Sequence, residues 1–373
     1  MAILYIGDSY TNSDIYYFSK IRIADPFAVL VDGQKVIIFI SPLEVDLVRK
    51  ESGADLVINT HQGGKPGLIS SIFEYLDRVG IDQIELDSKS SAKYYKYMID
   101  NARSLRIHLS SQEISARRVI KNQDEIKAIT STQEALDKVY ANILDYIASS
   151  RVSGEYLYQR DRLLTSELIK QMISVQLLEL GYHSPAGMIV SSGLDTADPH
   201  CQGSGPLIAN QFIVFDLFPS SIDNGYFTDM SRTIIRGQAS EAQLALYQEV
   251  YRAQALGLTM VKSKQGYQLI DQKIRQIFEQ HGYLTEGSAD SHQQGYFHGL
   301  GHGVGLDIHE LPIPVADIKL EVGQVITIEP GLYYTNPDKN PVGVIGGVRI
   351  EDTLVVTEQG SINLAKSSKG LVI

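Results

Sequence analysis

The sequence predicts a mixed α/β fold in two parts, an α/β domain over residues 1–118 and an α+β domain over residues 119–373. Two observations predict it. Before the boundary, short β-branched runs alternate with helical segments, and after it, paired strands alternate with amphipathic helices. With 373 residues, 43% of them hydrophobic, the chain can build two cores.

The first domain is predicted from its alternation of elements. Residues 27–41 hold two β-branched runs on either side of an Asp-Gly pair, which predicts a β-hairpin. Residues 67–80 have helical spacing and precede a short strand at 83–87. The same order returns at 91–101 and 106–110. This pattern is typical of a small α/β domain with a mixed sheet.

The second domain begins with a long amphipathic helix over residues 122–150, for which either Asn122 or Asp124 could be the N-cap. From there to residue 200 we expect helices to dominate. The apolar stripe of the long helix comprises Ile126, Ile129, Leu136, Val139, Tyr140, Ile143, Leu144 and Ile147.

Strand patterns then alternate with helices. Residues 205–235 are strand-like, with a turn between two apolar runs. Helices are expected near 240–263 and 268–281, and residues 322–356 contain a second pair of strands. The order hairpin, helices, hairpin indicates two related halves within this domain.

Composition excludes several classes of partner. The net charge of −11 and a pI near 5.3 argue against nucleic acid or an anionic membrane as the main partner. The single cysteine, Cys201, allows no intrachain disulfide and no thiolate zinc site, which fits a reducing compartment. The first twenty residues do not resemble a signal peptide, and the longest apolar run is too short to span a bilayer. We therefore expect a soluble cytoplasmic protein.

Four carboxylates stand inside or at the ends of apolar strands: Asp216, Asp229, Glu329 and Glu351. Each alone could be a solvent-exposed acid or one paired with a basic residue. Together they form two pairs, and burying an unpaired carboxylate costs several kcal/mol. Arg349 is predicted to share a strand face with Glu351 and to brace it, but one cation cannot neutralise four acids.

Three histidines, His298, His302 and His309, are embedded in glycine. The glycines argue against a helix, and in an extended strand the even spacing puts the first two imidazoles on one face. We expect the glycines to leave room for a peptide or another backbone beside the strand. A nucleotide-binding glycine loop competes poorly, because the segment opens no strand-to-helix turn.

Divalent cations are the simplest compensation for this set of side chains. Two of them would balance four carboxylates, and oxygen ligands with one imidazole suit Mn²⁺ above all, with Co²⁺, Zn²⁺ or Fe²⁺ possible. Two neighbouring metals can activate a shared hydroxide for hydrolysis.

These residues, in this order, resemble the pita-bread metallopeptidases, a family that includes prolidase, aminopeptidase P and methionine aminopeptidase. The resemblance covers about residues 120–373. It rests on DLF at 216–218, GYFTDMSRT at 225–233, HGLGHGVGLDIHE at 298–310, TIEPGLYY at 327–334 and GGVRIED at 346–352. The additional α/β domain is similar to the N-terminal domain of the prolidase and aminopeptidase P branch.

The resemblance implies a set of metal ligands. They are Asp216, Asp229, His302, Glu329 and Glu351. By analogy Asp229 and Glu351 bridge two metals, and Glu329 takes the proton of the attacking water. His200 matches a histidine near the scissile bond and His309 one that stabilises the oxyanion.

Two further positions have counterparts in the family. His298 matches a histidine of the proline pocket, and Arg349 matches an arginine that braces the ligands without touching the metal. Departures from the family pattern include Phe218-Pro219 after the first aspartate, and Ile313 where some dipeptidases carry a basic residue.

The activity implied is that of a dinuclear metallo-exopeptidase that cleaves the bond between an N-terminal residue and proline, acting on short proline-containing peptides. Relatives with such a first domain are often homodimers, so the resemblance implies a homodimer. Two alternatives share the fold: a catalytically inactive peptide-binding module and a metal-free, creatinase-like amidinohydrolase. Both typically lack ligands that this chain retains.

Overall fold

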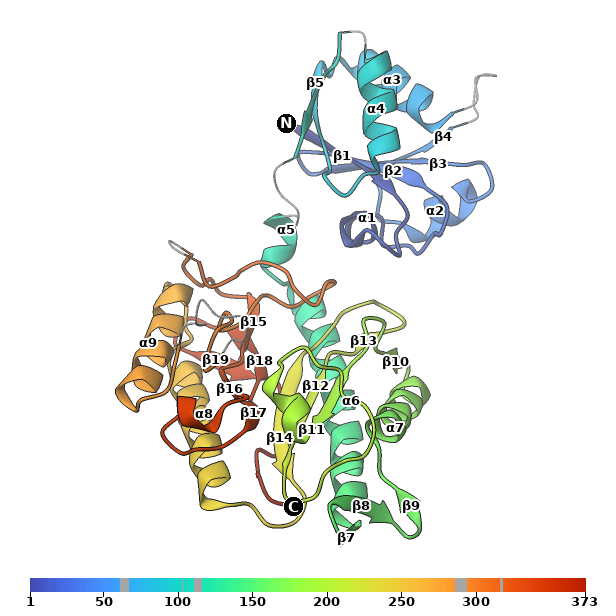
Figure 1. Cartoon of the computed structure of the whole chain (residues 1–373). Helices are drawn as coiled ribbons and strands as arrows, with labels where there is room; N and C mark the ends of the chain where they lie inside the picture. Colours follow the sequence, from blue (N-terminus) through green and yellow to red (C-terminus); the bar gives the residue numbers. More distant parts are fainter. Residues whose placement is uncertain (61–66, 103, 111–115, 286–293, 316–317) are drawn as a thin grey trace. The chain divides into compact units, whose positions relative to one another are not determined.

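The computed structural model describes residues 1–60, 67–102, 104–110, 116–285, 294–315 and 318–373. Contacts divide the chain into two compact units, Met1–Arg118 and Val119–Ile373. Each unit is built on its own β-structure (Figure 1). None of the described helices is both long and apolar enough to cross a membrane.

The first unit is built on a six-stranded mixed sheet with the order β4-β3-β2-β1-β5-β6. The strands are β1 (Ala2–Gly7), β2 (Phe27–Asp32), β3 (Lys35–Ile40), β4 (Leu56–Asn59), β5 (Gln83–Leu86) and β6 (Arg106–Leu109). The pairs β1–β2 and β2–β3 are antiparallel, and the other three are parallel. The predicted hairpin at 27–41 is confirmed, with Gly33 at φ +59° in its turn.

Helices cover both faces of this sheet because its strands are apolar on both sides. They are α1 (Ser13–Ser19), α2 (Val45–Glu51), α3 (Leu68–Val79) and α4 (Ala92–Asn101). The short helix α5 (Ala116–Val119) spans the boundary between the two units in the sequence. Residues of α3 and α4 share one hydrophobic cluster with the sheet, and residues of α1 and α2 share another. The two pairs lie on opposite faces of the sheet (Figure 1).

The second unit starts with α6 (Gln123–Ala148). Asn122 is its N-cap: the side chain of Asn122 accepts a hydrogen bond from the Glu125 backbone, and Glu125 reciprocates. A three-stranded hairpin sheet and α7 (Ser166–Glu179) follow. Its strands are β7 (Arg151–Ser153), β8 (Tyr156–Gln159) and β9 (Arg162–Leu163).

The expectation that helices dominate up to residue 200 is wrong in one important respect. The segment Ile189–Ser192 forms strand β11, which pairs with β12 (Phe212–Leu217), and β12 pairs in turn with β14 (Met230–Ile235). β11 is fully buried, so it lacks the alternation that marks a half-exposed strand. Short elements complete this region: β10 (Tyr182–His183), the 3-10 helix η1 (Gly193–Ala197) and β13 (Ser220–Ser221).

The predicted second pair of strands is also present, but it is interrupted. β15 (Val325–Ile328) pairs with β18 (Asp352–Val356), and β16 (Gly331–Tyr334) pairs with β17 (Gly346–Arg349). Glu329 and Glu351 lie in the interruption, where neither strand pairing includes them. The predicted helices are α8 (Glu241–Met260) and α9 (Tyr267–Gln280). Also present are the 3-10 helix η2 (Pro337–Lys339) and β19 (Ser361–Asn363).

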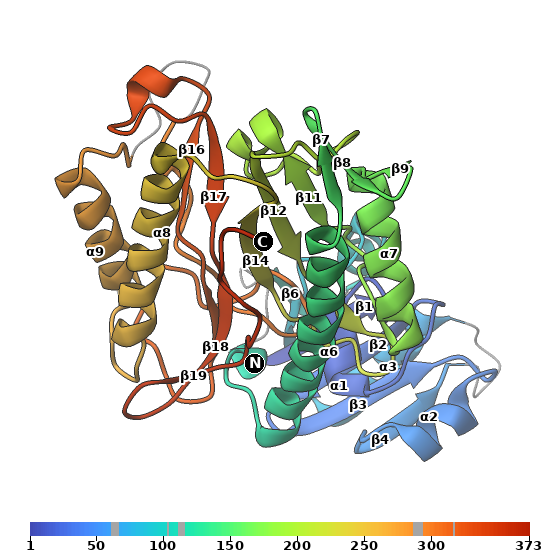
Figure 2. The same ribbon diagram turned by 90° about the horizontal axis from the view of Figure 1, so that it is seen from below.

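Two similar halves meet at β14. α6 and α7 pack on the sheet β11-β12-β14, whereas α8 and α9 pack beside β15 to β18, on the other side of the unit (Figures 1 and 2). Across the seam, Glu351 N donates to Ser231 O, and the hydroxyls of Thr233 and Thr353 bond to backbone groups of Arg349 and Asp229. The seam therefore brings residues about 120 positions apart into direct contact.

Candidate metal centre

The four predicted carboxylates all lie at this seam. Asp216 is in β12, opposite Ser231 of β14. Asp229 directly precedes β14 and Glu351 directly precedes β18, while Glu329 directly follows β15. Each half thus contributes carboxylates from its strands to the same site at the seam.

Ser231 shows how close the two halves come. Its Oγ lies 3.1 Å from Asp216 Oδ1 and 2.8 Å from Glu351 Oε2. The side chains of Asp229, His302 and Glu351 each offer an oxygen or nitrogen atom, and these atoms lie within 4.8 Å of one another. Such a group is compatible with a shared cation.

His302 joins the carboxylates through one ring nitrogen. Its Nε2 lies 3.4 Å from Glu329 Oε1 and 3.6 Å from Asp229 Oδ2. The other nitrogen, Nδ1, lies 3.1 Å from the carbonyl oxygen of Gly303, which can only accept, so Nδ1 carries the proton. Burial, with His309 nearby, lowers the His302 pKa to about 3. The neutral ring therefore presents an unprotonated Nε2 to the carboxylates, the form in which histidine binds metals.

The carboxylates repel one another in this arrangement. Burial and the charge of Asp216 raise the Glu351 pKa to about 8. Burial raises the pKa values of Asp229 and Glu329 well above the usual range, and Glu351 adds to both effects. Protein groups alone therefore do not compensate these charges.

Arg349 is the cation nearest the cluster, and its position corrects one expectation. Its Nη2 lies 2.7 Å from Asp216 Oδ2, so it braces Asp216 directly. It reaches Glu351 only through Ser231, whose Oγ accepts from Arg349 Nε at 2.8 Å. The expectation that Arg349 and Glu351 share a strand face predicted that Arg349 braces Glu351. In the structure the guanidinium bonds directly to Asp216 and contacts Glu351 through Ser231.

Two buried carboxylate oxygens among the described residues have no hydrogen-bond donor: Asp229 Oδ1 and Glu351 Oε1. Buried polar atoms without partners are rare in folded proteins, so each needs an explanation. A bound cation supplies one, since it removes the repulsion, satisfies both atoms and uses the free His302 nitrogen. The donor set of oxygens and one imidazole thus fits divalent metal ions.

The remaining predicted residues line a cavity of about 1160 Å³ beside the carboxylates. His200, His298 and His309 all face it, together with Phe218 and Phe297. His309 stands edge-on to His302, with ring centroids 4.3 Å apart. The structure thus places every predicted site residue at one cavity, and their individual roles stay predictions.

Tyr333 links two residues of this cavity, Arg349 and His298, and the sequence analysis did not single it out. Its hydroxyl accepts from Arg349 Nη1 at 2.9 Å and lies 3.1 Å from His298 Nε2. The Nδ1 atom of His298 lies 2.8 Å from the carbonyl oxygen of Gly299, so the hydroxyl proton of Tyr333 points to Nε2. Tyr333 therefore fixes the ring of His298.

The glycines between the histidines mainly serve one of the two expected roles, the close approach of another backbone. A Cβ on Gly301 would lie 2.3 Å from Thr327 O, and one on Gly303 would lie 2.1 Å from Leu311 O. At Gly305 it would meet the carboxylate of Glu310, which forms a buried ion pair with Lys121. Only Gly299 has open surroundings, where the nearest heavy atom, in Pro314, is 3.7 Å away. Most of these glycines therefore admit protein backbone and side chains rather than a peptide.

Comparison with known proteins places this site in a family. A model of metallopeptidase family M24 matches residues 127–358. The chain belongs to this family. The matched residues include all five side chains gathered at the seam, and membership of this metallopeptidase family together with the donor set indicates divalent metal binding.

Relatives of this M24 chain include peptidases that match it over most of its length. The Xaa-Pro dipeptidase of Pyrococcus furiosus is 29% identical over 370 residues, which cover 96% of this chain and 92% of that protein. The uncharacterized peptidase YqhT of Bacillus subtilis is 30% identical over 318 residues, 82% of this chain and 79% of that protein.

Solved structures confirm the fold. The prolidase from Pyrococcus furiosus superposes with a TM-score of 0.76 at 26% identity, covering 98% of this chain and 96% of that one. An Xaa-Pro dipeptidase from Bacillus anthracis gives a TM-score of 0.82 at 23% identity, covering 100% and 95%, and at that identity it shows the fold alone. The predicted combination of an α/β domain with a pita-bread catalytic domain is therefore correct.

Proposed function

We propose that this M24 peptidase is a metal-dependent exopeptidase that cleaves the bond between an N-terminal residue and proline. The single observation that carries the proposal is the gathering of four carboxylates and a neutral histidine, with two orphaned oxygens, at a cavity large enough for a short peptide. The names of the Pyrococcus relatives, Xaa-Pro dipeptidase and prolidase, support the choice of substrate.

Five residues are proposed to hold two divalent metal ions, with Mn²⁺ preferred: Asp216, Asp229, His302, Glu329 and Glu351. When bound, such ions supply a water activated at neutral pH and an electrophile for the peptide carbonyl. Asp229 and Glu351 are the proposed bridging ligands, which agrees with their central position and with an unpaired oxygen on each.

The proposed proton carrier is Glu329. Its side chain is mostly buried, and a carboxyl group whose pKa is raised by burial can accept a proton near neutral pH and release it to the departing proline nitrogen. Glu329 Oε1 also accepts from the Thr327 hydroxyl at 3.4 Å, which orients the carboxylate. The same atom lies 3.4 Å from His302 Nε2, within the group of ligands.

Three histidines are proposed to handle the substrate. His309 would donate to the carbonyl oxygen as negative charge develops on it, and His200 would contact the peptide near the scissile bond. His298, held by Tyr333, would line the proline pocket together with Phe297. Aromatic and imidazole rings offer a flat surface on which a pyrrolidine ring can pack.

The test uses protein purified without chelator. We expect roughly two transition-metal ions per chain and hydrolysis of Ala-Pro or Ala-Pro-Ala in the presence of Mn²⁺. Glu329→Gln should lower kcat by about 10²–10⁴-fold, whereas the control Glu321→Gln, on an exposed residue of the same unit, should not change it. Turnover by Glu329→Gln at the wild-type rate would refute the assigned role.

Metal content separates this proposal from its alternatives. A metal-free amidinohydrolase or an inactive binding module on this fold would contain no bound transition metal and cleave no Xaa-Pro peptide. We further propose a cytoplasmic homodimer that binds neither nucleic acid nor membrane, in agreement with the acidic composition. Sedimentation of the purified chain tests the dimer.

A further inference from the structure

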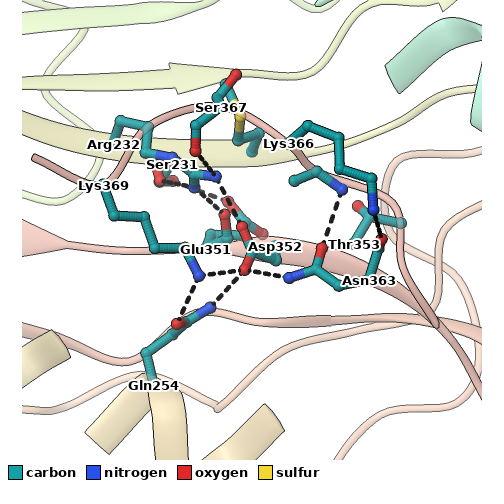
Figure 3. A network of polar contacts seen from close by, with 12 residues as sticks. Ser231, Arg232, Gln254, Glu351, Asp352, Thr353, Asn363, Lys366, Ser367 and Lys369 are labelled. Carbon is teal, nitrogen blue, oxygen red and sulfur yellow. Dashed lines mark hydrogen bonds and ion pairs between the residues drawn. The ribbon is translucent and has the colours of Figure 1, made fainter. Parts of the chain in front are cut away.

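Asp352 follows Glu351 directly and is the first residue of β18, and its carboxylate meets the side chains of Gln254, Asn363 and Lys369 (Figure 3). Its side chain is fully buried. It accepts four hydrogen bonds: from Arg232 Nη2 at 2.8 Å, Gln254 Nε2 at 2.9 Å, Asn363 Nδ2 at 2.7 Å and Lys369 Nζ. We call these five residues the back cluster.

Arg232 ties the back cluster to the carboxylates in front. Its Nη1 donates to the backbone oxygens of Ser231 at 2.8 Å and of Glu351 at 2.6 Å. Because successive residues of a strand face opposite sides, Ser231 and Glu351 face the metal centre whereas Arg232 and Asp352 face the back. The guanidinium therefore clamps both strands directly behind Ser231 and Glu351.

Lys369 closes the cluster from a segment that follows β19. Besides Asp352, its Nζ contacts Gln254 Oε1 at 2.9 Å. The segment is fixed on either side of Lys369: Ser367 bonds to Asp137 through its N and Oγ, and Ile235 N donates to Leu371 O. Lys369 lies outside residues 127–358, which the family model matches.

Resting on the proposed metal-dependent function, we infer that the back cluster positions Glu351 for metal binding and that Lys369 is a positioning residue of the metal centre. Within the described part of the chain, the carboxylate of Glu351 has one hydrogen bond, to Ser231, so its orientation depends on its backbone. That backbone is held by Arg232 and by the anchored side chain of the next residue. Removing one group that orients a metal ligand typically lowers the metal affinity by about 10–100-fold.

The test measures metal binding directly. Co²⁺ is titrated into the metal-free, full-length protein, and the visible absorption of bound Co²⁺ reports both the dissociation constant and the coordination geometry. Lys369→Met should weaken Co²⁺ binding by about tenfold or more and alter the spectrum, and Lys369→Arg should restore both. Lys366→Met is the matched control, because Lys366 is exposed on the same segment and its Nζ donates to the backbone oxygen of Asn363, outside the back cluster's side-chain contacts.

A purely structural role for Lys369 predicts a different result. Lys369→Met would then unfold at a lower temperature but bind Co²⁺ within twofold of wild type, and that outcome overturns the inference. Should Lys369→Met fail to fold, Lys369→Gln keeps a donor for Asp352 without the charge, and the same two outcomes decide. Failure of the wild-type protein to bind Co²⁺ would instead refute the proposed function on which the inference rests.

Discussion

Glu351 and Asp352 are neighbours in sequence, and both are buried, but their surroundings differ. Burial and Asp216 raise the Glu351 pKa to about 8. Burial would also raise the Asp352 pKa, but Arg232 and Lys369 outweigh it and lower that pKa to about 2. The back of the strand carries its own cations, and the front carries only Arg349 among the described residues. A buried acid with fixed partners stabilises the fold, whereas one without them creates a need for an ion from solution.

The largest expected difference between front and back is in stability. Asp352→Asn removes the carboxylate partner of the buried Arg232 and of the partly buried Lys369, and should lower the free energy of unfolding by about 3–5 kcal/mol. Asp229→Asn, at the front, removes a repelled carboxyl and should leave the stability of the metal-free protein unchanged or raise it. Urea unfolding with chelator present measures both variants. Equal destabilisation by the two substitutions would contradict the comparison.

With metal bound, the carboxylate of Asp229 should stabilise the protein. Mn²⁺ at a hundred times its dissociation constant should stabilise the wild-type protein by about 2.7 kcal/mol for each site, since it binds only the folded state. Asp229→Asn should lose most of this gain, because a proposed bridging ligand is gone. Thermal unfolding with and without Mn²⁺ measures it, and Mg²⁺ at the same concentration serves as the control. An undiminished Mn²⁺ shift in the variant would exclude Asp229 as a ligand.

The pH dependence of the metal-free protein provides a third test. The folded-state pKa values of Glu351, Asp229 and Glu329 are raised above their unfolded values. Between about pH 7 and 8 these carboxyl groups therefore bind more protons in the folded state than in the unfolded state. Stability should therefore fall with rising pH, by about 1.4 kcal/mol per pH unit for each extra proton bound. His298 and His302, whose folded-state pKa values are lowered to about 3, are neutral in the folded state in this window. In the unfolded state they are still partly protonated near pH 7, which opposes the fall, so the fall should be steepest toward pH 8.

Saturating Mn²⁺ should abolish this fall, because a bound cation favours the ionised carboxylates. The urea midpoint at pH 7.0, 7.5 and 8.0, with chelator or with Mn²⁺, supplies the comparison. A midpoint that rises with pH in the chelated protein would show that the front carboxylates are already compensated.

The smallest expected effect concerns the Ser231 hydroxyl at the front. Ser231→Ala removes the contact shared by Asp216, Glu351 and Arg349 and should cost about 1 kcal/mol of stability. Thr259→Ala, which removes an exposed hydroxyl on α8 that bonds only to Leu256 O, is the control. We expect Ser231→Ala to be less destabilising in the metal-free protein than Asp352→Asn. The reverse order would place the main support of Glu351 at Ser231.

Much of the second unit was predictable because its apolar strands contain acids at fixed places. The hairpins of residues 205–235 and 322–356 follow from apolar, β-branched runs on either side of turns, and carboxylates inside them stand out. β11 was missed because its four residues, two of them serines, form no such run. For the glycine segment the sequence left two neighbours open, a peptide or another backbone, because the approach of Thr327 and Leu311 depends on tertiary packing.

The back cluster shows what a strand pattern can and cannot reveal. Arg232 and Asp352 alternate with Ser231 and Glu351, so their opposite orientation was predictable from strand geometry. The contact of Lys369 with Asp352 was not predictable. The two residues are 17 positions apart, and Lys369 lies in a segment without regular secondary structure. Arg349 was assigned to the wrong carboxylate because the seam joins strands that the sequence does not show to be neighbours.

The position of Lys369 has a consequence for how the protein is made. Ribosomes synthesise the chain from residue 1 onward, so the carboxylates at 216, 229, 329 and 351 emerge before the lysine that closes the cluster behind them. A nascent chain that ends before residue 369 would hold all the proposed ligands without that cation. Metal acquisition should thus be a late event in biogenesis, completed only after this segment has left the ribosome.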